Sequence, residues 1–352
     1  MTIIAAVGIA AVAVTRPWNH GDSRRGSVAD ARAADAASFL RRYVDGDGRV
    51  ARKDQGGDTV SEAQGYALLL SVAADEPELF ERVWTWTRSH LQRDDQLFSW
   101  HWGSGDVVDA QPATDADIDI AWALALAAGR FHRPQYGTAA TAIANAVLTH
   151  ESVNIPSGIA VVAGPWARTS TPTINPSYLA PQAFKTLRRI TGDHRWDLVS
   201  ESACRIVIEL TTYKLPPDWA HLDANGHAMP SAAPDGSPAQ YGPDAARLPI
   251  LWATAPDEGE RHLAGRMWSM LERLPAGLGA LPTTLDGSRT NLPETDTQPL
   301  GLLAASFAAT AANDHASASR LLASARDLDD HRHTYYSDAW LALSGVLTDL
   351  SQ

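Results

Sequence analysis

Three carboxylates at predicted helix starts have the spacing and surroundings that catalysis would need. Glu62 lies between a polar turn and an apolar run at residues 67–70. Asp115 and Asp244 open two later helices in a similar way. Because the helix dipole favours a carboxylate in the first turn, a structural role is the alternative for each. We predict that the three helix starts face one cleft, and that Glu62 is a general acid there.

The elements that must position these side chains are almost all helices. Apolar spacing and flanking turn residues predict twelve helices. They cover approximately residues 27–44, 61–74, 76–91, 114–130, 135–149, 176–190, 193–210, 243–255, 258–274, 298–311, 315–325 and 335–350. Ser61 or Thr59 is expected to cap the second helix. A short β piece is expected around residues 158–162, and no β-rich domain is expected.

The connections between these helices alternate in length. Even-numbered helices follow long loops, and odd-numbered helices after the first follow short turns. The long loops cover residues 45–60, 92–113, 150–175, 211–242 and 275–297. This alternation predicts antiparallel hairpins, and six hairpins that close on themselves form an all-α (α/α)6 barrel. The long loops then share one end of the barrel, where we expect the functional site.

A polar residue stands at the start of every even-numbered helix. These residues are Glu62, Asp115, Asn175, Asp244, Gln298 and Tyr336. In the predicted barrel they form a ring around the end that carries the long loops. The acids and Tyr336 are therefore expected to contact the same ligand.

The loops at this end are also rich in tryptophan. The chain has 12 Trp against 6 Phe, and Trp100, Trp102, Trp166 and Trp219 lie in the long loops. Trp offers a broad apolar face for the C–H face of a sugar, together with an N–H donor. The Trp residues within helices are expected to pack in the core. Paired carboxylates beside loop-borne Trp indicate glycoside hydrolysis, which needs one proton donor and a second carboxylate.

Composition restricts the class of ligand. The 352 residues include 29 Lys and Arg against 41 Asp and Glu, a formal net charge of -12. This balance argues against nucleic acid and anionic membranes as partners. The single cysteine, Cys204, forms no intrachain disulfide and is expected to be a small buried residue. Residues 115–119 start like a calcium loop, but Ile120 and Leu126 replace its Gly and Glu. We expect no metal and no cofactor.

The first residues have the composition of an export signal. Residues 3–14 are an unbroken apolar run that is too short to span a bilayer comfortably, with a possible cleavage site at residues 11–13. We expect residues 1–25 to be an export signal or anchor with a short linker. Residues 26–352 then form one (α/α)6 domain that is secreted, periplasmic or held at the outer face of the membrane.

Four segments, in order along the chain, carry a resemblance to glycoside hydrolase family 8. Residues 60–66, VSEAQGY, resemble the SEGQGY motif of that family, and residues 113–117 resemble its ATDAD signature. Residues 175–178, NPSY, and 244–247, DAAR, are similar to its NPSY and DAxR segments. The resemblance extends from about residue 44 to residue 336, and implies an (α/α)6 barrel with an inverting mechanism on β-1,4-glycans.

The resemblance also implies a role for each matched residue. Glu62 aligns with the general acid and Asp244 with the general base that activates water. Asp115 aligns with a carboxylate that binds the sugar at the cleaved bond, and Arg247 with a neighbour of the base. The aromatic residues that fall where the family stacks sugars are Trp100 or Trp102, Trp166 and Tyr178.

Two positions depart from the family pattern. Pro243 stands directly before the base, where the family usually has Tyr, and Tyr241 comes two residues earlier. Ala63 replaces the customary Gly. The Pro-Pro-Asp-Trp segment at residues 216–219 is most similar to the exported members that accompany bacterial cellulose synthase, which is therefore an expected partner. A monomer is expected.

Three functions follow from these observations. The first is an endo-acting inverting hydrolase of β-1,4-glucan, a cellulase. The second uses the same fold and acids on chitosan, xylan or a mixed-linkage glucan. The third is a glycan-binding protein without turnover, against which the presence of both Glu62 and Asp244 argues.

Overall fold

The computed structural model describes residues 34–212, 214–274, 279–287 and 297–350. The predicted export segment and linker, residues 1–25, lie outside this range, as do the start of the first predicted helix and much of the predicted loop 275–297. Of the first helix, residues 34–43 are described and are helical. Within the described residues, no helix is long and apolar enough to cross a membrane.

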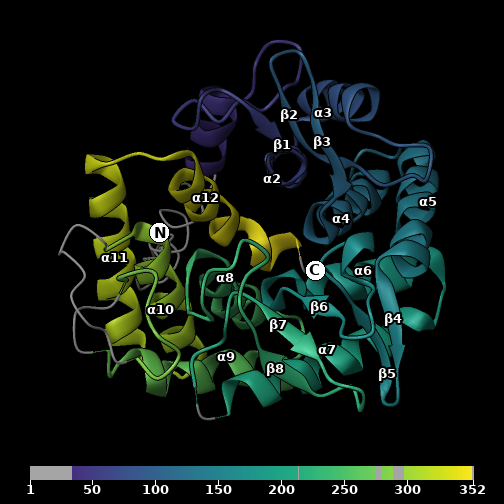
Figure 1. Ribbon diagram of the computed structural model, residues 1–352. Coiled ribbons are helices and arrows are strands. Elements are labelled where there is room, and N and C mark those ends of the chain that lie inside the picture. The colour runs from purple at the N-terminus through teal and green to yellow at the C-terminus, as the bar shows by residue number, and fades with distance from the viewer. Residues whose placement is uncertain (1–33, 213, 275–278, 288–296, 351–352) are drawn as a thin grey trace, which may run out of the picture.

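The helices form two concentric layers (Figure 1). The even-numbered ones are α2 (Ser61–Ala73), α4 (Thr114–Arg130), α6 (Pro181–Thr191), α8 (Pro243–Ala253), α10 (Pro299–Ala311) and α12 (Tyr335–Leu350). Each contacts the next, and α12 returns to α2, so they form a closed inner ring. The odd-numbered ones are α3 (Pro77–His90), α5 (Pro134–His150), α7 (Arg195–Thr211), α9 (Glu258–Leu271) and α11 (His315–His331). Each packs against the even-numbered helix before it, which confirms the predicted (α/α)6 barrel.

The inner helices are apolar on nearly every side because they are covered on nearly every side. In α2, the run from Ala63 to Val72 is buried throughout, and α10 is buried from Pro299 to Ser306. Such all-round apolarity is what a helix in the centre of a large protein requires. The helical Trp residues are buried as predicted, with Trp122, Trp196 and Trp252 among the largest fully buried side chains. Cys204 is free and partly buried.

Two local predictions were wrong. Residues 176–190 do not form one helix: a 3-10 turn, η2 (Pro176–Tyr178), precedes α6. The helix restarts at Pro181 because a residue before proline avoids the α region, and Ala180 is extended at φ -102 and ψ 98. Neither predicted cap of α2 operates, since its N-cap is Val60 and no side chain caps it. The Thr59 hydroxyl donates instead to the Val50 carbonyl at 2.8 Å.

Small sheets fill the long loops. β1 (Thr59–Val60), β2 (Ser99–Gly103) and β3 (Asp106–Pro112) form one antiparallel sheet, in which Val60 pairs with His101. β4 (Ser152–Ile155) and β5 (Gly158–Val161) form the strand piece that the sequence predicted. β6 (Thr173–Ile174), β7 (Ala220–Leu222) and β8 (Ala228–Pro230) join two different loops. These sheets fix the loops relative to the helix starts that follow them.

Candidate active site

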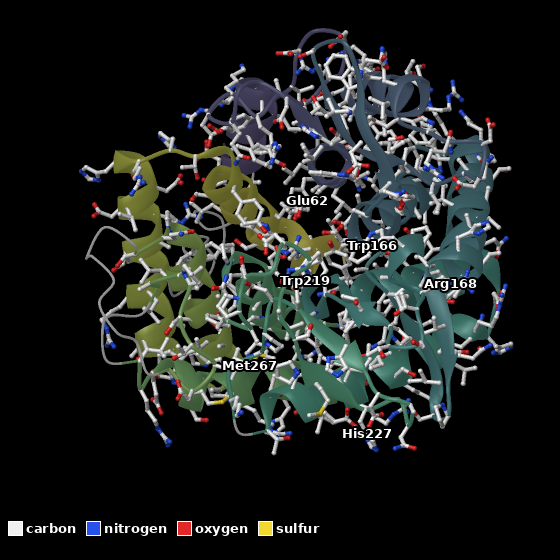
Figure 2. The ribbon with its side chains drawn as sticks, viewed as in Figure 1. Glu62, Trp166, Arg168, Trp219, His227 and Met267 are labelled. Atoms are coloured by element: carbon white, nitrogen blue, oxygen red, sulfur yellow. The ribbon has the colours of Figure 1, made fainter. Side chains whose placement is uncertain are left out.

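The three predicted carboxylates meet on one buried guanidinium. Arg247 Nη1 donates to Glu62 Oε1 and to Asp115 Oδ2, the latter at 3.1 Å, and Nη2 donates to Asp244 Oδ1 at 3.2 Å. Arg247 is only 3% exposed. Glu62 lies near the centre of the molecule, at the start of α2 (Figure 2). The starts of α2, α4 and α8 therefore face one site, as the alternating loops predicted.

The local sequence explains how each group reaches this point. Glu62, Asp115 and Asp244 all lie in the first turns of their helices, so their positions follow from rigid backbone. Arg247 comes three residues after Asp244, which places both on the same face of α8. Pro243 is the first residue of α8, a position that needs no N–H donor and suits the fixed φ of proline. The departure at this position is thus compatible with a regular helix start.

Asp244 is held from both sides. Its Oδ2 accepts from Asn175 Nδ2 at 2.8 Å, while its Oδ1 faces Arg247. Asn175 is itself fixed, because its Oδ1 accepts from the backbone N–H and the hydroxyl of Ser177 at 3.1 and 2.7 Å. The Ser177 hydroxyl also accepts from Arg247 Nη2 at 2.5 Å. The η2 turn therefore orients the carboxylate, a role for Ser177 that the sequence did not reveal.

Asp218 is a further residue of this site that sequence reasoning missed. Its Oδ1 accepts from the backbone N–H groups of Gly242 and Ala245 at 3.0 and 2.8 Å, so it holds the start of α8. Glycine suits position 242, because an added Cβ would lie 2.1 Å from Asp218 Oδ2 and would displace the Asp218 carboxylate. Burial and the nearby Asp244 raise the pKa of Asp218 to about 6. The sequence signal for Asp218 was its place in the Pro-Pro-Asp-Trp segment at residues 216–219.

Three carboxylates share the single positive charge of Arg247, and this excess of negative charge favours the protonated form of a carboxyl group. Burial raises the pKa of Asp115 to about 7, with Glu62 and Asp244 adding to the rise and Arg247 opposing it. Burial and Asp115 likewise raise the pKa of Asp119, one turn further along α4, well above its usual range. A proton is therefore retained in this group of carboxylates near neutral pH.

Glu62 has a second donor besides Arg247, because the Tyr66 hydroxyl donates to Glu62 Oε1 at 2.5 Å.

The shared guanidinium also limits the separation of the two carboxylates expected to catalyse. Since both contact Arg247, the contacting oxygens of Glu62 and Asp244 lie no more than roughly 8 Å apart. Inverting enzymes hold their two carboxyl groups about 6.5–9.5 Å apart, which leaves room for a water. The upper limit is compatible with that arrangement.

Asp117 lies behind the site and not in it. The side chain is fully buried, and its Oδ1 accepts from the Phe98 backbone N–H at 2.8 Å. Burial and the neighbouring Glu151 raise its pKa well above the usual range. This contact fixes the chain just before β2, so Asp117 supports the site from outside it.

Trp166 and Trp219 are loop aromatics that lie close together. Their ring centroids are 6.4 Å apart, and the side chains lie beside each other below Glu62 in Figure 2. Trp166 is 42% exposed, unusual for so large an apolar side chain. Tyr178 lies against the group around Arg247, with its ring centroid 5.6 Å from the Arg247 guanidinium carbon. Tyr336 lies in the first turn of α12. Burial raises the pKa of its hydroxyl well above the usual range, and the charges of Arg247 and the three carboxylates also act on it.

Trp100 and Trp102 occupy the strand that pairs with β1. Trp100 stacks on His101 with centroids 4.8 Å apart. Trp102 is already engaged, since the Arg49 guanidinium carbon lies 4.5 Å from its ring centroid and Trp86 meets it edge-on. His101 Nε2 contacts Asp58 Oδ2 at 2.9 Å, which fits a structural histidine. Trp100 is thus the freer of the two rings for a sugar.

Comparison with known proteins identifies the family. The family model described as glycosyl hydrolases family 8 matches residues 26–349. A probable endoglucanase of Novacetimonas hansenii is 32% identical over 267 residues, covering 73% of this chain and 76% of the relative. The structure of endo-beta-1,4-glucanase CMCax from Acetobacter xylinum superimposes with a TM-score of 0.75 at 29% identity, covering 91% and 98% of the two chains. A beta-1,3-1,4-glucanase from Paenibacillus sp. X4 shares the fold with a TM-score of 0.78 at 22% identity, covering 93% of each chain. The chain belongs to glycosyl hydrolase family 8 and is a glycoside hydrolase.

Proposed function

We propose that this protein is an endo-acting, inverting β-1,4-glucanase in which Glu62 is the general acid and Asp244 the general base. The observation that carries the proposal is the buried Arg247, which gathers Glu62, Asp115 and Asp244 within hydrogen-bonding reach of one side chain. The endoglucanase names of the relatives support the substrate class.

The geometry suits the two steps that inversion requires. Asp244, fixed by Asn175 and Arg247, takes a proton from a water that attacks the anomeric carbon. Glu62 gives its proton to the glycosidic oxygen as the bond to the leaving sugar breaks. Each turnover therefore leaves Glu62 ionised and Asp244 protonated, and solvent restores both states. Asp115 binds the sugar at the cleaved bond.

The aromatic residues supply sugar platforms in this proposal. Trp166, Tyr178 and Trp100 supply flat apolar faces along the long-loop end, and Tyr336 supplies a further hydroxyl near the acids. A β-1,4-glucan presents alternating C–H faces that such rings cover. The endoglucanase names of the relatives support cleavage within a chain.

The decisive experiment compares Glu62→Gln with Glu78→Gln. Glu78 is a matched control, because it is also a first-turn glutamate but is exposed on α3. On soluble cellulose, Glu62→Gln is expected to lose roughly 10²- to 10⁴-fold in kcat, whereas Glu78→Gln keeps its rate. Unchanged activity in Glu62→Gln would exclude it as the acid. Xylan, chitosan and mixed-linkage glucan are assayed in parallel. If one of them is cleaved faster than soluble cellulose, that polysaccharide replaces β-1,4-glucan as the proposed substrate.

The stereochemistry and a binding assay separate the remaining alternatives. NMR of early products from a β-linked substrate is expected to show the α-anomer, and an initial β-anomer would contradict inversion. Wild-type protein that binds soluble cellulose without cleaving it would support the glycan-binding alternative.

The proposal includes export and association with a cellulose synthase machinery. The apolar residues 3–14 support export, and the similarity of residues 216–219 to cellulose-synthase-associated members supports the partner. Sequencing the N-terminus of protein recovered outside the cytoplasm tests export, since retention of residues 3–14 would identify an anchor instead of a cleaved signal.

A further inference from the structure

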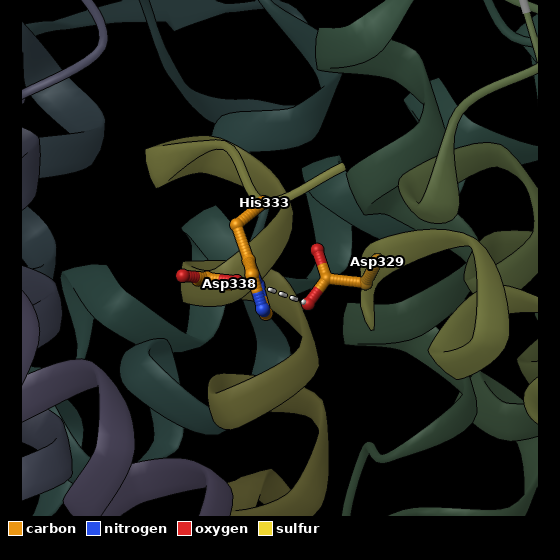
Figure 3. Close-up of side chains that lie close together, drawn as sticks. All are labelled: Asp329, His333 and Asp338. Carbon is orange, nitrogen blue, oxygen red and sulfur yellow. Dashed lines mark hydrogen bonds and ion pairs between the residues drawn. The ribbon is translucent and has the colours of Figure 1, made fainter. Parts of the chain in front are cut away.

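A second cluster of ligand-type side chains lies where α11 ends and α12 begins. His333 Nδ1 is 2.9 Å from Asp338 Oδ1 and 3.3 Å from Asp329 Oδ2 (Figure 3). One ligand atom from each of the three residues lies within 4.8 Å of the others. The cluster is separate from the network around Arg247, and the proposed hydrolysis assigns it no role.

The Asp329 carboxylate is the least satisfied group of this cluster. Asp329 is only 6% exposed, and its Oδ1 meets no hydrogen-bond donor in the described part of the chain. Figure 3 shows the carboxylate facing His333. A buried carboxylate oxygen without a partner is unfavourable unless a proton or a cation compensates it. The second oxygen of Asp338 differs, because Arg42 and Tyr43 donate to Oδ2 at 2.6 and 2.8 Å.

We propose that Asp329, His333 and Asp338 bind a divalent transition-metal ion, for which Zn²⁺ is the best match. One imidazole nitrogen and two carboxylate oxygens are ligands that zinc accepts at about 2.0–2.2 Å, which places neighbouring ligand atoms roughly 3.3 Å apart. The two separations from His333 already approach this value. An ion bound here takes the place of the proton that the Asp329 and Asp338 carboxyl groups otherwise share.

The surroundings fit an ion that keeps a water ligand. The three residues line a cavity of about 110 Å³, whose lining also includes Asp35, Asp330 and Arg42. The side chain of His333 is 41% exposed, so the cavity is open to solvent on that side. Arg42 and Tyr43 donate to Asp338 Oδ2 and so fix this carboxylate, as outer partners commonly fix a metal-binding carboxylate. The sequence signal was an Asp-x3-His pair at a helix end, followed five residues later by Asp.

The ion would join the ends of the barrel. Asp329 lies on α11, Asp338 lies in the first turn of α12, and Arg42 lies in the helix of residues 34–43. The site therefore ties the last hairpin to the first, and fixes the turn that carries Tyr336. It is a stabilising site that does not depend on the proposed catalytic roles.

Zn²⁺ binding to the intact protein tests the proposal. Chelator-treated protein is titrated with Zn²⁺ by calorimetry at neutral pH, and one ion per chain is expected. At a hundredfold excess over Kd, bound Zn²⁺ is expected to raise Tm by about 4 °C. His333→Ala and Asp329→Asn should each weaken binding at least tenfold and remove the Tm shift. Asp329→Asn keeps the shape of the side chain, so it reports on binding even if His333→Ala perturbs folding.

The matched control is His331→Ala. His331 is exposed on the same helix, and its Nδ1 contacts the Asp327 carbonyl and not the cluster. This variant should bind Zn²⁺ as the wild type does. Absence of stoichiometric binding to the wild type would overturn the proposal, as would equal binding by wild type and the two cluster variants.

Discussion

The buried Glu151 provides a prediction in which a conservative substitution stabilises the protein only at higher pH. Glu151 is fully buried at the end of α5, where its carboxyl group meets Asp117 and the Thr114 hydroxyl. No further donor reaches its two side-chain oxygens or Asp117 Oδ2 within the described residues. Two adjacent buried carboxyl groups satisfy each other by sharing a proton. Consistent with this, burial raises the pKa of Glu151 to about 8.

The sign and size of the effect follow from proton linkage. Because the folded-state pKa is raised from 4.5 to about 8, the folded protein holds a proton that the unfolded chain releases across this range. Below pH 4.5 both the folded and the unfolded protein hold the proton, and the stability of the folded state is at its full value. As the pH rises from 4.5 towards 8, only the folded state keeps the proton, so the free energy of unfolding decreases. At about 1.4 kcal/mol per pH unit, the free energy of unfolding falls by roughly 4–5 kcal/mol.

Glu151→Gln removes this dependence. The amide stays neutral at every pH and can donate an N–H to Asp117, so the pair needs no extra proton. Wild type and variant are compared by urea unfolding at several values between pH 5 and pH 9. The variant is expected to gain roughly 4 kcal/mol relative to the wild type between the two ends. Other buried acids, such as Asp115, contribute equally to both proteins and cancel in the difference.

A surface substitution supplies the control for this comparison. Glu201→Gln, on the exposed face of α7, should run parallel to the wild type at all pH values. Activity at pH 6 should be retained in Glu151→Gln, because Glu151 contacts no substrate. Parallel stability curves for wild type and Glu151→Gln would refute the shared proton.

Three further substitutions test the site itself on soluble cellulose. Arg247→Lys should lower kcat by at least roughly 10³-fold, because one ammonium cannot replace a planar fork that binds three carboxylates, and near-normal kcat would contradict this. Asp218→Ala should lower kcat about tenfold with little change in KM, and reduce stability by about 1–2 kcal/mol, since the amides of Gly242 and Ala245 lose their acceptor. Trp166→Ala should raise KM roughly tenfold with a smaller effect on kcat, whereas a pure loss of kcat would contradict a sugar platform.

The helix starts could be predicted because their signals are local. The apolar runs, the polar turns and the alternation of loop lengths all lie within neighbouring residues, and they placed Glu62, Asp115 and Asp244 at one end of the barrel. The start of α6 was misplaced because Pro181 interrupts a run that otherwise suits a helix. Its effect on Ala180 is a competition between backbone sterics and apolar spacing, which the spacing alone does not decide.

The contacts between distant segments could not be predicted in the same way. Arg247 was expected beside Asp244, three residues away, but its bond to Glu62 joins residues 185 positions apart. Asp218 lies within a loop, 24 residues before the amide of Gly242 that it caps, so no capping pattern marks it. A cap normally reveals itself by lying next to its helix. Here the loop returns to the helix start, and only the folded structure brings the two together.

The division between helix starts and loops has a consequence for how the reaction and its specificity can vary. The groups around Arg247 come from first turns of inner helices and from the η2 turn, and buried hydrogen bonds fix them together. The tryptophan rings come from loops and small sheets, and Trp166 lies in a 3-10 turn at the surface. Substitutions in these loops can therefore move the proposed sugar contacts of the tryptophans, while the carboxylates around Arg247 stay in place. Changes at the helix starts disturb several carboxylates at once, because each shares Arg247 with the others.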